Sequence, residues 1–121
     1  MKVQIPALIA AAALGWASAA SAHPHIKTAS PAADAVLTAS PTEIRITFSE
    51  AVVPAFSGFD LKDASGKAID LGKAAVNPKN KKELAAPVKA TLAAGTYTLA
   101  WHALGDDTHH VTGHYDFEVK P

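Results

Sequence analysis

Three histidines and two aspartates lie within the eleven residues GDDTHHVTGHY, which begin at Gly105 near the C-terminus. Imidazole nitrogens and carboxylate oxygens are ligands that Cu(II) and Zn(II) take in proteins. The sequence contains no cysteine, and its single methionine is Met1, so a site built from thiolate or thioether sulfur is not expected. These residue types therefore favour a metal site built from nitrogen and oxygen ligands.

The first residues, MKVQIPALIAAAALGWASAASAHPH, have the pattern of a secretory signal peptide. A short positive region precedes the apolar run 5–17, which is too short for a comfortable membrane span. The small residues A-S-A follow, in the A-x-A pattern that signal peptidase accepts. We predict cleavage after residue 22, which makes 1–22 the signal peptide and leaves an exported domain over 23–121 that begins with His23.

The predicted mature chain has the length of one domain with one core. Its charge is nearly balanced, with ten basic and eleven acidic side chains. It has no basic patch, which argues against nucleic acid as a partner. Without cysteines it forms no disulfide, so the core must hold the exported fold together, with help from a bound metal if there is one. No exposed apolar stripe indicates an oligomer, so we expect a monomer.

Several segments alternate apolar and polar side chains with the two-residue period of a half-buried strand. They are 43–48, 59–62, 68–71, 96–103 and 111–119. Turn residues separate them, such as Asp63–Gly66 between the second and the third. The alanine-rich segment 85–94 is the best helix candidate, although Pro87 and Gly95 limit its length. The pattern predicts an all-β sandwich of short strands.

Five aromatic side chains fall on the apolar faces of these segments and are expected in the core: Phe48, Phe59, Tyr97, Trp101 and Phe117. Gly113 lies on the apolar face of the last strand, where a backbone can approach closely. The polar segment 77–82, NPKNKK, is expected to be a solvent-exposed loop.

Together these segments resemble the CopC family of periplasmic copper-binding proteins. The resemblance rests on HPH directly after the predicted cleavage site, on FSE, GTYTLAW and D-x-H followed by TG, and on the longer segments ASPAADAVLTASPTEIRITFSEAV and FSGFDLKDASGK. These motifs follow the family's order and cover nearly the whole mature chain. The resemblance implies a seven-stranded Greek-key β-sandwich of immunoglobulin-like or cupredoxin-like type.

The resemblance also implies one Cu(II) ion per chain. In the family the N-terminal histidine and the aspartate and histidine of D-x-H bind copper, and these positions are His23, Asp107 and His109 here. The glutamate of FSE, Glu50, matches a carboxylate that lies near the copper. The implied function is that of a periplasmic copper carrier or buffer in resistance, homeostasis or uptake, not an enzyme. A copper-transporting inner-membrane protein is a candidate partner.

Many members of the family also carry a methionine-rich loop that binds Cu(I). Residues 23–121 contain no methionine. Because a Cu(I) site normally needs thioether or thiolate ligands, the chain resembles a Cu(II)-only form.

The residues themselves support this chemistry. An N-terminal His23 would offer two nitrogens, its α-amine and its ring, and the imidazole of His109 would add a third, the arrangement called a histidine brace. Asp107 would add an oxygen and a negative charge, which gives the tetragonal nitrogen and oxygen set that Cu(II) prefers. A nearby Glu50 would help to balance the remaining positive charge.

His25 raises the possibility of a competing site. A free N-terminus can bind Cu(II) through its amine, two deprotonated backbone amides and the imidazole of the third residue. The second residue here would be Pro24, which has no N–H to lose. The local peptide site is therefore blocked, and His25 is left as a weak ligand at most.

Four further polar side chains adjoin the predicted site or lie on its strands: Asp106, His102, His110 and His114. Asp106 and His110 stay open as alternative ligands, because each is next to a predicted one. His102 and His114 are expected on solvent-facing sides of their strands and away from the metal.

The alternative function is that of an enzyme, a copper-dependent oxidase or a lytic polysaccharide monooxygenase. Such enzymes also place a terminal-histidine brace on a β-sandwich. Against this reading, the mature chain has little loop length from which to build a flat substrate face. An aspartate next to the copper would also crowd the position where oxygen must bind.

Overall fold

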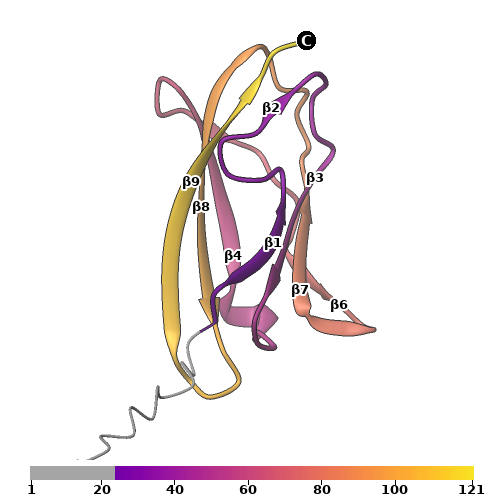
Figure 1. Cartoon of the computed structure of the whole chain (residues 1–121), viewed down its shortest axis with the longest axis vertical. Coiled ribbons are helices and arrows are strands. Elements are labelled where there is room, and N and C mark those ends of the chain that lie inside the picture. Colours follow the sequence, from indigo (N-terminus) through magenta and orange to yellow (C-terminus); the bar gives the residue numbers. More distant parts are fainter. Residues whose placement is uncertain (1–23) are drawn as a thin grey trace, which may run out of the picture.

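The computed structural model describes residues 24–121, which form two β-sheets packed face to face (Figure 1). Residues 1–22, the predicted signal peptide, and His23 lie outside the described residues, so the cleavage site stays a prediction. Within residues 24–121 no helix is long and apolar enough to cross a membrane.

The first sheet has four strands in the order β1-β3-β7-β6, and the second has five in the order β2-β9-β8-β4-β5. The strands of the first sheet are β1 (Ile26–Ser30), β3 (Glu43–Phe48), β6 (Ala75–Asn77) and β7 (Asn80–Pro87). Those of the second are β2 (Val36–Leu37), β4 (Gly58–Asp63), β5 (Ala68–Ile69), β8 (Gly95–Leu104) and β9 (His110–Val119). A single 3₁₀ turn within residues 24–121, η1 (Pro54–Phe56), precedes β4.

This strand order is that of an immunoglobulin-type sandwich. The sheet β1-β3-β7-β6 corresponds to strands A, B, E and D of that fold, and β9-β8-β4 corresponds to G, F and C. Two of the strands in residues 24–121, β2 and β5, have only two residues each, and the other seven form the main framework. The predicted β-sandwich is therefore confirmed, with two short edge strands added to it.

The core consists of the inward-facing residues of both sheets. In β3 the alternation predicted from the sequence is observed directly, since Ile44, Ile46 and Phe48 are fully buried. From the other sheet, the rings of Tyr97 and Phe117 stack at a centroid distance of 5.7 Å. Burial of each such side chain contributes about 1.5–3 kcal/mol, so the alternating strands supply the apolar faces on which the two sheets pack.

Two of the five expected core aromatics, Phe59 and Trp101, are only partly buried and pack against the core from its edge. The Trp101 ring lies 5.4 Å from that of Phe48 and covers Gly113 on the neighbouring strand. A Cβ at Gly113 would lie 2.6 Å from Trp101 Cζ2. The glycine on the apolar face of β9 thus makes room for the indole side chain, whereas its position in the sequence indicated the close approach of a backbone.

The start of β8 is anchored by a tyrosine corner. The hydroxyl of Tyr97 donates a 2.7 Å hydrogen bond to the carbonyl of Ala93, four residues upstream. Immunoglobulin-type sandwiches use this contact to hold the crossover between their sheets. It fixes where β8 begins and therefore where its far end, next to Gly105, must lie.

The helix candidate over residues 85–94 was wrong. Its first three residues end strand β7, in which Leu84 and Ala86 are buried in alternation, and no helix follows. Pairing with β3 overrides the helix propensity of alanine, because a central strand position satisfies the backbone of this segment on both sides. The expected loop 77–82 is also shorter than predicted, since Asn80–Lys82 already belong to β7.

Candidate metal centre

The Asp107 and His109 side chains lie on the hairpin that joins β8 to β9. The N–H of Thr108 donates to the carbonyl of Gly105 at 3.0 Å, and the N–H of Gly105 donates to the carbonyl of His109 at 2.9 Å. Thr108 adopts a φ of 72°, which is uncommon for a β-branched residue. Holding such a residue costs about 1–3 kcal/mol and requires support from surrounding structure.

Asp107 and His109 contact each other directly. Asp107 Oδ1 accepts a hydrogen bond from the backbone N–H of His109 at 3.2 Å, and Asp107 Oδ2 lies 2.8 Å from His109 Nδ1. The contact with the histidine side chain, helped by the backbone N–H, lowers the pKa of Asp107 below its usual value. The carboxylate is therefore ionised throughout the neutral range and available as an oxygen ligand.

Two other segments pack against this hairpin at the same end of the sandwich (Figure 1). The segment after β3 pairs with it, because the N–H of Asp106 donates to Ala51 and that of Val53 donates to Leu104. The N-terminal segment joins through Ser49, whose N–H donates to His25 at 2.8 Å and whose Oγ accepts from the His25 N–H at 3.0 Å. Three parts of the chain that are far apart in sequence thus meet at one point.

Gly105 marks that point. A Cβ at this buried glycine would lie 2.9 Å from Asp107 Oδ1, 3.1 Å from Glu50 Oε2 and 3.3 Å from Pro24 Cδ. The two carboxylates and the first residue that the structure describes therefore surround one backbone position. The glycine lets them approach closely, a role that no pattern in the sequence indicated.

The structure brings together most of the side chains that the sequence predicted for the site. Asp107 and His109 form a pair, and the carboxylates of Glu50 and Asp107 both lie next to Gly105. His23 lies outside the described residues, and its role stays a prediction. Within residues 24–121 no three histidine, cysteine, aspartate or glutamate side chains are arranged to hold a metal ion, so the pair needs a further ligand to complete a site.

His25 is exposed, and its backbone N–H is engaged by Ser49. This hydrogen bond adds to the effect of Pro24, since the amide would have to give up its proton to bind copper. Asp106 is also exposed, and its backbone N–H is bonded to Ala51. The part of these two residues in metal binding stays a prediction.

The histidines on the strands do not all lie as expected. His114 is exposed on the outer face of β9, as predicted. His102 lies on the outer face of β8, as expected, but it is half-buried there, whereas exposure to solvent was expected. Its ring rests against Gly58 of β4, where a Cβ would lie 3.1 Å from His102 Cε1. Because glycine has no side chain, the neighbouring strand leaves room for the imidazole.

Comparisons with known proteins agree with this architecture. Residues 26–120 match the CopC domain family. The chain is 39% identical over 99 residues to protein YobA of Escherichia coli K12, covering 82% of this chain and 80% of YobA. It is 36% identical over 114 residues to copper resistance protein C of Escherichia coli, covering 88% and 89% of the two chains.

A solved structure shows the same likeness in three dimensions. The crystal structure of CopC from Methylosinus trichosporium OB3b superimposes with a TM-score of 0.77 at 32% sequence identity, over 82% of this chain and 95% of that one. The family match spans all nine strands of the sandwich and the hairpin that carries Asp107 and His109. On these grounds the chain belongs to the CopC family.

Proposed function

We propose that this protein binds one Cu(II) ion through His23, Asp107 and His109, and serves as a periplasmic copper carrier or buffer in copper resistance, homeostasis or uptake. The copper is cargo. The proposal rests above all on the convergence of Pro24, Glu50 and Asp107 on Gly105, because it brings the residue next to His23 up to the two carboxylates. A related protein is named for copper resistance.

The spacing of the described pair fits the proposed ligand set. Two ligand atoms bound to one ion at about 2.0 Å and at right angles are about 2.8 Å apart. Asp107 Oδ2 and His109 Nδ1 are separated by 2.8 Å. The pair can therefore act as two neighbouring ligands, or the aspartate can orient the ring so that Nε2 binds the metal.

His23 would complete the site with its ring and, after cleavage, its α-amine. Pro24 is buried against Gly105 and follows His23 directly. The chain would therefore bring the ring nitrogen and the α-amine of His23 to the metal centre. Glu50 would remain outside the ligand set, and its charge would favour a divalent cation near Asp107. The absence of methionine and cysteine from residues 23–121 favours Cu(II) over Cu(I) as the bound ion.

The terminal amine provides the direct test. A chain that begins at His23 should bind Cu(II) tightly, and a chain with one alanine added before His23 should bind it more weakly by orders of magnitude. The added residue keeps every side chain and moves only the amine. Competition titrations with a chelator of known affinity measure the difference, and equal affinities for the two chains would exclude the histidine brace.

A further inference from the structure

The outer face of the five-stranded sheet carries a second pair of histidines. The rings of His102 on β8 and His110 on β9 lie 6.1 Å apart between centroids, with an interplanar angle of 70°. In the strand register His102 is opposite Thr112, and His110 is opposite Leu104. The two histidines are therefore diagonal neighbours on one face, a placement from which long or aromatic side chains can reach each other.

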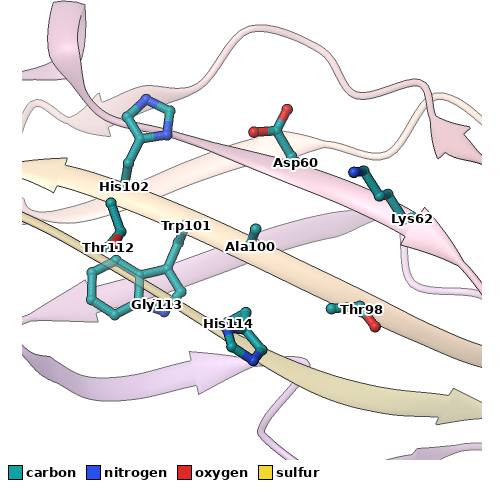
Figure 2. A pocket seen from close by; sticks show the side chains of 9 residues that line it. All are labelled: Asp60, Lys62, Thr98, Ala100, Trp101, His102, Thr112, Gly113 and His114. Atoms are coloured by element: carbon teal, nitrogen blue, oxygen red, sulfur yellow. The ribbon is translucent and has the colours of Figure 1, made fainter. Parts of the chain in front are cut away.

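The His102 side chain packs against the neighbouring strand, β4. Its ring rests over Gly58 on β4 and is half-buried there. Figure 2 shows the side chains of His102 and Trp101 on opposite sides of β8, and both line a pocket together with Asp60. His110, by contrast, is exposed at the first residue of β9. One imidazole is thus partly enclosed by the neighbouring strand, while the other is exposed to solvent.

We propose that His102 and His110 together form a second, weaker binding position for a divalent cation of borderline softness, such as Cu(II) or Zn(II). A metal–nitrogen bond of about 2.0 Å places an imidazole centroid about 3.1 Å from the ion, so two bound rings have centroids about 4.4 Å apart at right angles and about 6.2 Å apart when opposed. The observed 6.1 Å lies within this range. Water fills the remaining coordination positions.

This position adjoins the copper site proposed above without sharing its ligands. His110 follows His109 directly in the chain, so the two positions are neighbours along the start of β9. Two imidazoles hold an ion less tightly than three nitrogens and a carboxylate, so the second ion exchanges faster. The pair can therefore bind an ion transiently before it enters the main site or after it leaves. The role in transfer rests on the function proposed above, whereas binding of an ion at the pair does not.

The test is a titration of the chain 23–121 with Cu(II), followed by calorimetry and electron spin resonance. We expect one tight equivalent and one weak equivalent. His102→Ala should remove the weak equivalent and leave the tight one unchanged. His114→Ala, which removes an exposed imidazole from the same face of the sheet, should leave both. Because His102 is half-buried, His110→Ala serves as a second variant with little risk to the fold, and it should also remove the weak equivalent.

The background variant Asp107→Ala separates this proposal from the function proposed above. In that variant the tight equivalent should weaken while the weak one persists and still disappears with His102→Ala. The proposal is overturned if the parent chain binds no weak equivalent, or if the weak equivalent survives both His102→Ala and His110→Ala. It is also overturned if His110→Ala removes the tight equivalent and keeps the weak one, because His110 would then belong to the main site.

Discussion

Two aspartate turns lie near opposite ends of β8 and use the same local motif in different ways. Asp63 pairs with Tyr97 near the start of β8, whereas Asp107 follows the end of that strand. In both turns the carboxylate accepts a hydrogen bond from the backbone N–H two residues later, which is the Asx-turn arrangement. In both the pKa of the aspartate is lowered, at Asp63 first by the hydroxyl of Ser65 and at Asp107 first by the His109 side chain.

The two turns differ in what holds them. Asp63 Oδ1 accepts from the N–H and hydroxyl of Ser65 and from the N–H of Lys67, all within its own turn, and Gly66 takes the positive φ of 86°. At the other end Thr108 takes a positive φ, and the turn packs against Glu50 and Pro24. Local preference is enough for the first turn. The Asp107 turn needs tertiary contacts, which is expected of a site assembled from segments far apart in the sequence.

The largest expected difference between the two ends is their response to copper. Cu(II) should stabilise the chain 23–121 by about 4 kcal/mol when free copper exceeds the Kd a thousandfold. Amide hydrogen exchange should slow in the Asp107 turn and stay unchanged in the Asp63 turn. Exchange measured with and without copper checks this, and equal protection of both turns would contradict the assignment of the site.

The same stabilisation should disappear in mild acid. Amines and imidazoles bind metals only as free bases, so protons compete with Cu(II) for the proposed nitrogen ligands and should displace it as the pH falls below about 6. The two aspartates have lowered pKa values, so their contribution to folding is present above about 3.9 and is lost only as the pH falls through their folded values. At about pH 4.5 the protein should remain folded, and Cu(II) should no longer stabilise it. Thermal melts at neutral and acid pH measure both, and a copper effect undiminished in acid would indicate binding dominated by carboxylates.

The next largest effect is expected from replacing the aspartate of each turn with alanine. Asp107→Ala should weaken Cu(II) binding at least about a hundredfold, since even groups that only orient metal ligands change affinity tenfold to a hundredfold. His109→Ala should do the same, and both should alter the electron spin resonance spectrum of bound Cu(II). Asp63→Ala is the matched control. It should lower the melting temperature and leave copper affinity unchanged, so a loss of affinity in this variant would show that the two turns are not separate.

The smallest effects are expected from the glycines of the two turns. Gly105→Ala should keep the fold, because the atoms closest to the new Cβ are the ends of the Asp107 and Glu50 side chains. The new methyl group should displace these carboxylates and lower the affinity for Cu(II) about tenfold. Gly66→Ala should cost about 1–2 kcal/mol of folding stability, because its φ is 86°, and should leave copper binding intact. Melts and copper titrations of both variants test this contrast, which fails if Gly105→Ala binds copper like the parent chain.

Much of the sandwich could be predicted from the sequence. Strand β3 was predicted with the bounds that the structure gives it, and β8 and β9 were predicted to within a residue or two. In these segments alternation and burial agree, so each side chain reports the face on which it lies. The strand β7 was missed because alanine and lysine carry little strand preference, and its pairing with β3 and β6 decides its conformation.

The candidate site divides in the same way. The sequence by itself determined which residue types are available to bind a metal, with no cysteine and no methionine other than Met1. It also determined that Asp107 lies close to His109, because residues two apart on a tight turn must lie close together. Only the tertiary structure decided that Pro24, Glu50 and Asp107 meet at Gly105, and that His102 leans over Gly58 within reach of His110. These contacts join segments far apart in the chain or on neighbouring strands. Their distances depend on strand register and on the space that two glycines leave open, and neither can be read from residue spacing.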